Sequence, residues 1–91
     1  MSQSEQPRPR ARLYLVSPPA IDLPEFAGKL KAAFAGGDVG AFQLRLKNAD
    51  DATILKAAET LIPICREHKT AFIMNDSAKL AVTCGADGLH I

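Results

Sequence analysis

Hydrophobic and polar positions follow two alternating patterns along the chain. Short apolar runs rich in strand-forming residues are typical of buried β-strands, and they occur at 12–16, 39–46, 71–74 and 87–91. The segments between these runs place apolar residues three and four positions apart, which is the spacing of one helix face. Helices are therefore predicted over 25–35, 50–68 and 77–85.

Prolines and polar residues refine the predicted helix ends. Pro24 stands where proline is favoured, in the first turn of a helix. Asn48 or Asp50 is suited to cap the second helix. Pro63 lies inside that helix, where proline removes a backbone donor and clashes with the preceding turn. We expect Pro63 to kink or split the second helix.

The predicted order βαβαβαβ implies an α/β protein with four parallel strands joined by right-handed crossovers. Two architectures satisfy this order. An open doubly wound sheet is complete with few strands, whereas a (β/α)8 TIM barrel needs eight strands and roughly 200 residues or more. The 91 residues here suffice for the first architecture or for the N-terminal half of the second. The hydrophobic pattern alone does not choose between them.

Composition excludes several classes of protein. The chain has 47% hydrophobic and 23% charged residues, as ordinary globular proteins do, and its net charge of +1 draws it neither to nucleic acid nor to an anionic membrane. No apolar run approaches the roughly 18 residues that cross a membrane, so we place the protein in the cytoplasm. Cys65 and Cys84 are expected to be reduced. Residues 1–11 are polar and form a predicted disordered tail, which leaves one domain at 12–91.

Three polar side chains alternate with apolar ones in the second predicted strand. Gln43, Arg45 and Lys47 project from one face of FQLRLK. That face meets water if the strand lies at a sheet edge, but in a barrel it points inward, where polar residues near the carboxyl end of a strand mark the active-site mouth. Arg and Lys beside an amide suit a phosphate or diphosphate ligand.

Asn75 and Asp76 end the third predicted strand just before a helix, and they too lie at the barrel mouth. Asp76 has two interpretations. It is a preferred residue type for a helix N-cap, and it is also a hard oxygen ligand suited to Mg²⁺ in the presence of substrate phosphates. Asn75 is then placed to bind substrate.

His90 lies between Leu89 and Ile91 in the fourth predicted strand, so it faces away from both. A histidine at such a position is most often a hydrogen-bonded core residue. Contact with a substrate is the alternative interpretation.

Four segments together resemble thiamine phosphate synthases in their order and spacing. They are LYLVSPP at 13–19, FQLRLK at 42–47, IMND at 73–76 and GADGLHI at 85–91. The resemblance extends over residues 12–91. One departure is Leu46, because the family often has an acidic residue between the Arg and the Lys; Leu46 is predicted to face away from the barrel interior.

The resemblance implies the N-terminal half of a (β/α)8 barrel and a transferase of thiamine biosynthesis. Such an enzyme joins hydroxymethylpyrimidine diphosphate to thiazole phosphate, forms thiamine phosphate and releases diphosphate with Mg²⁺, without a protein nucleophile or acid and base. By motif position, the pyrimidine diphosphate ligands are Gln43, Arg45, Lys47 and Asn75. Asp76 corresponds to a magnesium ligand. His90 also matches, but without a defined chemical role.

The resemblance also implies that parts of the site lie beyond this sequence. The family's second magnesium carboxylate follows the strand-four motif, and its thiazole phosphate site lies in the later half. We therefore expect a fragment that is inactive alone and prone to self-associate through open barrel edges. Two alternatives are a thiazole tautomerase-like paralogue, which shares the fold, and a non-catalytic phosphate-binding half-barrel. The row of Gln43, Arg45 and Lys47 with Asp76 favours the synthase.

Overall fold

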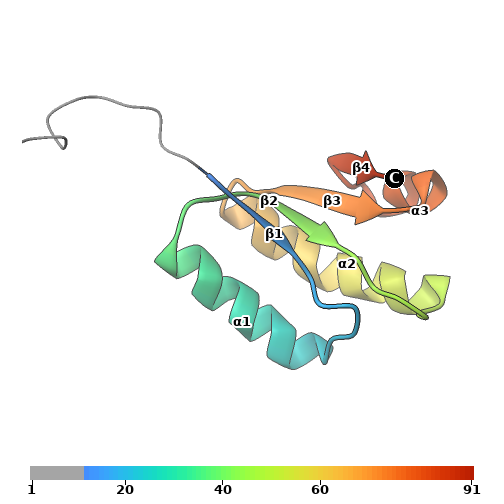
Figure 1. The fold of residues 1–91 in the computed structure, drawn as a ribbon, viewed down its shortest axis with the longest axis horizontal. Coiled ribbons are helices and arrows are strands. Elements are labelled where there is room, and N and C mark those ends of the chain that lie inside the picture. The colour runs from blue at the N-terminus through green and yellow to red at the C-terminus, as the bar shows by residue number, and fades with distance from the viewer. Residues whose placement is uncertain (1–11) are drawn as a thin grey trace, which may run out of the picture.

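Four parallel strands alternate with three helices in residues 12–91, the part of the chain that this computed structural model describes (Figure 1). The strands are β1 (Leu13–Val16), β2 (Val39–Leu44), β3 (Ala71–Asn75) and β4 (Gly88–His90). The helices are α1 (Leu23–Gly36), α2 (Asp51–Glu67) and α3 (Ala78–Cys84). The predicted βαβαβαβ order is confirmed. The predicted disordered tail at 1–11 lies outside the described residues.

The sheet has the strand order β1-β2-β3-β4, and every neighbouring pair is parallel. A doubly wound sheet reverses its strand order at a switch point and carries helices on both faces. Here the order does not reverse. All three helices contribute to a single buried cluster, with members such as Leu30, Leu61 and Leu80. The helices therefore cover one face of the sheet, as they do around a (β/α)8 barrel.

The core lies between the sheet and these helices. Phe72 of β3 is fully buried and packs on Phe42 of β2, with ring centroids 5.9 Å apart; Phe26 of α1 packs on Phe42 at 5.8 Å. Tyr14 and Val16 of β1 pair with Ala41 and Gln43, so they point to the opposite face, where each is about half exposed. The sheet thus has one buried face and one open face.

Local capping explains where the helices begin. The Asp22 side chain accepts a hydrogen bond from the Glu25 backbone N–H at 3.2 Å, and Pro24 lies in the first turn of α1. Asp50 caps α2 by accepting from the Thr53 backbone N–H at 2.8 Å, which decides between the two predicted caps. Hydrogen bonds from Thr53 lower the pKa of Asp50. Over residues 12–91, no helix is both long and apolar enough to span a lipid bilayer.

Pro63 does not split α2, so that part of the prediction is wrong. The helix continues from Asp51 to Glu67 with Pro63 inside it. Pro63 and Glu59, whose carbonyl loses its usual partner, are both exposed, so water can satisfy the free carbonyl. The helical residues on either side of the proline are buried in the core: Leu61, Ile62, Ile64 and Cys65. Their packing outweighs the local cost of proline.

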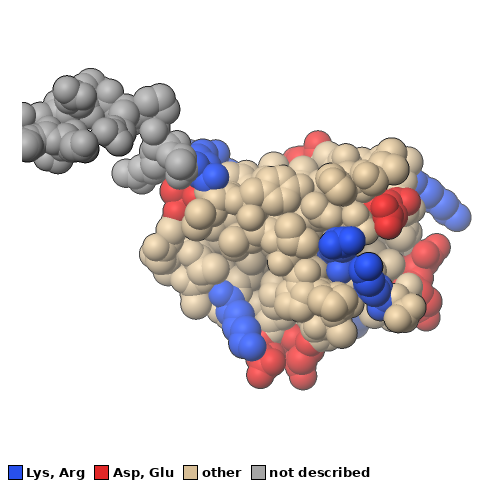
Figure 2. Space-filling view, in the orientation of Figure 1, with Lys and Arg blue, Asp and Glu red and all other residues tan. Residues whose placement is uncertain are grey.

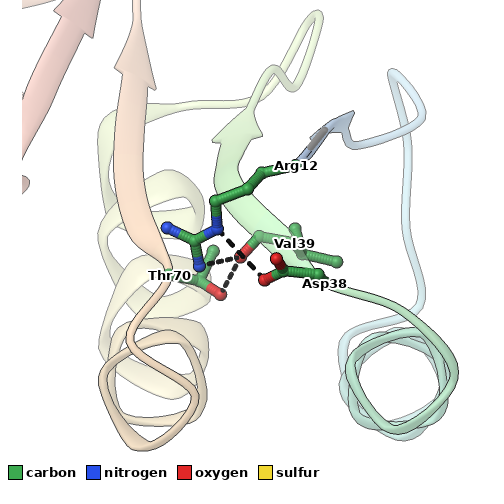
Figure 3. A network of polar contacts seen from close by, with 4 residues as sticks. All are labelled: Arg12, Asp38, Val39 and Thr70. Atoms are coloured by element: carbon green, nitrogen blue, oxygen red, sulfur yellow. Dashed lines mark hydrogen bonds and ion pairs between the residues drawn. The ribbon is translucent and has the colours of Figure 1, made fainter. Parts of the chain in front are cut away.

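A polar network joins β1, β2 and the start of β3 at the amino ends of the strands (Figure 3). The Val39 carbonyl accepts hydrogen bonds from the Thr70 hydroxyl at 2.7 Å and from Arg12 Nη2 at 3.3 Å. Arg12 Nε also pairs with Asp38 at 3.0 Å. In barrels this end of the strands carries stability, whereas the opposite end carries the active site.

Both cysteines are free, as predicted, but their surroundings differ. Cys65 is fully buried in α2, and burial, together with the nearby charge of Asp87, raises the pKa of its thiol to about 11. Cys84 is half-buried at the end of α3. Only the thiolate reacts with alkylating reagents, so a buried thiol with a raised pKa resists them.

We therefore expect iodoacetamide at pH 8 to modify Cys84 in the folded chain and to modify Cys65 only after unfolding. Mass spectrometry of the modified peptides measures both rates. Because the pKa of Cys65 is higher in the folded chain, its contribution to stability is complete below about pH 9 and declines as the pH rises toward 11. Cys84→Ser serves as the control, since it leaves only the buried thiol. Equal modification rates at both positions in folded protein contradict the expectation.

Candidate functional site

The carboxyl ends of the strands surround an open hollow on the face opposite the helices. Its volume is about 470 Å³, and its lining comes from β1, β2, β4 and the residues after β2: Tyr14, Val16, Gln43, Arg45 and His90. Basic side chains gather over the carboxyl end of β2 (Figure 2). In a barrel, this is the interior face at the end where active sites lie.

Gln43 is the most buried polar residue of this hollow, with 4% of its surface exposed. Its Nε2 donates a hydrogen bond to the Tyr14 hydroxyl at 3.0 Å. Its Oε1 is buried and has no hydrogen-bond partner among residues 12–91. A buried amide oxygen without a partner is uncommon in folded proteins.

The second strand is two residues shorter than predicted, because β2 ends at Leu44 rather than Leu46. Ser17 N–H still donates to the Gln43 carbonyl at 2.9 Å, and the Ser17 hydroxyl accepts from the Arg45 N–H at 2.9 Å. Ser17 is followed by Pro18 and Pro19 in the segment after β1, and prolines have no N–H to continue the hydrogen-bond ladder with β2. Arg45 is exposed just beyond the strand, and its side chain makes no ion pair within the described residues.

Lys47 does not line the same hollow as Gln43 and Arg45. It lines a second hollow of about 550 Å³ between the loop after β1, the loop after β2 and the first turns of α2. Its backbone N–H donates to the Pro19 carbonyl at 2.9 Å, and the next residue, Asn48, has a left-handed φ of 57°. The chain turns here, so the strict alternation of the predicted row holds only for its first two members.

Asn75 and Asp76 follow different geometries at the end of β3. Asn75 Oδ1 lies 3.4 Å from Nδ1 of His90 on β4. Asp76 adopts a left-handed φ of 66°, and its backbone N–H donates to the His90 carbonyl at 2.7 Å. Left-handed backbone is uncommon outside glycine, although Asp tolerates it better than most residues.

The interpretation of Asp76 as a helix cap is wrong. Ser77 caps α3 instead, since its hydroxyl accepts from the Leu80 N–H at 3.1 Å. The Asp76 carboxylate is exposed and is left free by the helix. The interpretation of His90 as a core residue is also wrong, because His90 is exposed and lines the hollow.

Asp76 is the carboxylate that the sequence analysis assigned to Mg²⁺. Among residues 12–91, no three His, Cys, Asp or Glu side chains gather as a metal-binding group. Mg²⁺ commonly keeps several waters and binds one or two carboxylates together with substrate phosphates. Asp76 is exposed after β3, and its backbone is bonded to His90, which lines the hollow with Arg45, so its carboxylate fits that limited requirement.

A comparison with protein families decides the relationship. The family model described as thiamine monophosphate synthase matches residues 13–91. The chain belongs to the thiamine monophosphate synthase family. Among curated relatives, the thiamine-phosphate synthase of Rhodospirillum centenum is 50% identical over 80 residues, and that of Hyphomonas neptunium is 38% identical over 96.

The match to these thiamine-phosphate synthases extends over their N-terminal part. It takes in 88% of this chain but 39% of the Rhodospirillum protein, and 100% of this chain but 43% of the Hyphomonas protein. The chain therefore spans about two-fifths of the length of these relatives.

A solved structure supports the same relationship. The thiamine phosphate pyrophosphorylase of Pyrococcus furiosus superposes with a TM-score of 0.74 at 26% identity, over 88% of this chain and 38% of that one. The four-stranded unit is thus the N-terminal part of a TIM barrel, and the doubly wound alternative is wrong.

The sequence reasoning missed Tyr14, which lines the hollow, and Ser17, which holds the backbone beside it. Tyr14 contacts Gln43, and Ser17 binds the Arg45 backbone. The sequence did contain a signal for Tyr14. Tyr14 is two positions before Val16, so the alternation of a strand puts both side chains on one face of β1. Ser17 offered no comparable signal, since its partner lies 28 residues away.

Proposed function

We propose that residues 12–91 form the pyrimidine diphosphate side of a thiamine phosphate synthase active site. The observation that carries this proposal is the pairing of Gln43 and Arg45 in one open hollow at the carboxyl ends of the strands. Among residues 12–91, the Gln43 amide has an acceptor without a partner, which suits the polar edge of a ring, and the Arg45 guanidinium has no ion-pair partner, which suits a diphosphate. The family membership supports the same assignment.

The proposed reaction breaks the bond between the pyrimidine methylene carbon and a diphosphate oxygen. The diphosphate leaves with the bonding electrons, and the thiazole nitrogen then forms a bond to the methylene carbon, giving thiamine phosphate. Arg45 binds the leaving diphosphate and offsets its charge, and Gln43 orients the pyrimidine ring. Positioning and charge stabilisation of this kind need no protein nucleophile.

Four further residues have proposed roles around this pair. Asn75 and Lys47 bind the diphosphate, Lys47 by a change of side-chain conformation from its present position in the second hollow. His90 contacts the substrate beside Asn75. Asp76 would hold Mg²⁺ together with substrate phosphates, and the ion would supply positive charge to the leaving group.

The setting of this activity is also proposed. We place it in the cytoplasm, where free thiols such as those of Cys65 and Cys84 persist. β1 and β4 are the outer strands of the described sheet, and their backbone edges are suited to pair with further barrel strands or with a second copy.

A chimera tests the proposed activity. The whole 91-residue chain is continued by the C-terminal part of the Rhodospirillum centenum relative, beginning where the matched region ends. We expect this protein to form thiamine phosphate from the pyrimidine diphosphate and the thiazole phosphate, and to stop when EDTA removes Mg²⁺. Chromatographic measurement of the product gives the rate.

The C-terminal part alone is the control and is expected to make no product. A chimera that unfolds cooperatively, yet neither binds the pyrimidine diphosphate in calorimetry nor forms product, overturns the proposal. Binding without product formation would favour the non-catalytic module, and tautomerase activity without condensation would favour the paralogue.

A further inference from the structure

Two hydrogen bonds tie the segment after β1 to the segment after β2. The Ser17 hydroxyl accepts from the Arg45 N–H and the Pro19 carbonyl accepts from the Lys47 N–H, both at 2.9 Å. Pairing of β2 with β3 has already ended at Leu44. Arg45 is thus the first residue after the paired strand, and the Ser17 hydroxyl holds its backbone where the pairing stops.

The Ser17 side chain takes the place of a backbone acceptor of its own residue. The Ser17 N–H donates to the Gln43 carbonyl at 2.9 Å, and in a regular parallel ladder the Ser17 carbonyl would accept from the residue two positions further on, which is Arg45. The Arg45 N–H donates to the Ser17 hydroxyl, and that hydroxyl donates to the Pro18 carbonyl at 3.1 Å. The chain can therefore turn away into Pro18 and Pro19 while Arg45 stays in the register of β2.

Burial separates the two partners. Ser17 is 5% exposed, whereas Arg45 is exposed and lines the hollow at the carboxyl ends of the strands. Among residues 12–91, the lining of that hollow does not include Ser17, so its effect on a ligand passes through Arg45. A long side chain on a fixed backbone has fewer conformers to lose on binding than the same side chain on a loose one.

We propose that Ser17 is a positioning residue of the diphosphate site, whose hydroxyl holds the Arg45 backbone in the register of β2 and so keeps the guanidinium directed into the hollow. This inference rests on the proposed function, in which Arg45 binds the diphosphate. Without the hydroxyl, water can reach the N–H of the exposed Arg45. The protein then still folds, but the guanidinium samples positions away from the leaving group, and catalysis by positioning is sensitive to such displacement.

Ser17→Ala in the chimera tests this role, with Thr70→Ala as the matched control. Thr70 is also buried, at 4% exposure, and its hydroxyl also binds the backbone of the β2 segment, but at the amino end through the Val39 carbonyl. We expect Ser17→Ala to lower kcat/KM for the pyrimidine diphosphate about three- to tenfold, the range of one net hydrogen bond. Thr70→Ala should change kcat/KM by less than about twofold, although it removes a comparable hydrogen bond from the fold.

A double-mutant cycle gives a readout that a merely structural role would not change. In an Arg45→Ala background, Ser17→Ala should change kcat/KM by less than about twofold, because the effects of residues that act through one another are not additive. Ser17→Cys is a second variant of nearly the same size whose sulfur is a weak acceptor, and it should reproduce the loss. Thermal unfolding of each variant verifies that it is folded.

Amide hydrogen exchange, followed by NMR in the chimera without substrate, measures the tie itself. The Arg45 amide should exchange at least about threefold faster in Ser17→Ala, since its acceptor is gone. The Leu80 amide is the reference, because it donates to another serine hydroxyl, that of Ser77 in α3, and its exchange should not change.

The inference is overturned if folded Ser17→Ala and Ser17→Cys variants keep the full kcat/KM, or if the Arg45 amide exchanges no faster in Ser17→Ala. It is also overturned by a loss no greater than that of Thr70→Ala, or by an equal loss with and without Arg45→Ala. In each of these cases the unmodified chimera is active, so the proposed function stands. An unmodified chimera that neither binds the pyrimidine diphosphate nor forms product refutes the proposed function, and this inference with it.

Discussion

Arg45→Ala is expected to lower kcat/KM for the pyrimidine diphosphate in the chimera by about 10- to 150-fold. This range corresponds to the loss of one charge-assisted hydrogen bond of about 1.5–3 kcal/mol. Arg45 is exposed beside the hollow without an ion-pair partner among the described residues, so its guanidinium is free to bind a diphosphate. Because Arg45 has no ion pair among residues 12–91, its removal deprives no described carboxylate of a partner, and the effect should fall on the substrate rather than on folding.

Two control variants sharpen this test. Arg45→Lys retains the charge but loses the planar fork, and it should give an intermediate loss. Lys29→Ala removes a cation from the exposed outer surface of α1 and should leave kcat/KM unchanged. Initial rates over a range of pyrimidine diphosphate concentrations provide kcat and KM. An Arg45→Ala enzyme with unchanged kcat/KM would exclude the proposed role.

Phe72→Ala is expected to lower the free energy of unfolding of the chain by about 3–5 kcal/mol. Phe72 of β3 is fully buried between the sheet and the helices, and its ring packs against Phe42 of β2. Its backbone is also fixed, since the Phe72 N–H donates to the Asp87 carboxylate and the Asp87 N–H donates to the Phe72 carbonyl, both at 2.8 Å. The backbone therefore cannot move to fill the cavity, and the loss is large against a typical domain stability of about 5–15 kcal/mol.

Urea unfolding measures this loss as a shift of the midpoint at constant slope. Val82→Ala is the matched control, because Val82 is an apolar residue of α3 with 83% of its surface exposed, and its truncation should change stability by less than about 0.5 kcal/mol. A loss below about 1 kcal/mol for Phe72→Ala would show that the aromatic cluster does not hold β2 and β3 in place.

The order of elements could be predicted from the sequence because each element has its own periodicity. Runs such as AFIM at 71–74 and the helical spacing of Leu30 and Phe34 are local properties, and the structure places Phe72, Met74, Leu30 and Phe34 in the core. Asp50 as a cap is likewise local, since its partner Thr53 is three residues away. The error at Pro63 has the opposite origin, because packing of α2 in the core outweighs a local preference.

The candidate site was predicted in part. Gln43 and Arg45 were assigned to one face from alternation, and they do line one hollow. Lys47 was assigned with them, yet it lines another hollow. The ladder between β1 and β2 ends before Lys47, because Pro18 and Pro19 follow β1 and have no N–H to donate. The sequence of β2 does not reveal where the ladder ends, since the prolines that lack N–H donors belong to the segment after β1.

The sequence by itself determined the α/β order, the parallel strands and the family resemblance, because these depend on residue type and spacing along the chain. Only the tertiary structure decided that all helices lie on one face, that Ser77 rather than Asp76 caps α3, and that His90 is exposed. It also brought Tyr14 within 3.0 Å of Gln43. Such contacts depend on the register between strands, and register is set by packing and hydrogen bonds between segments far apart in sequence.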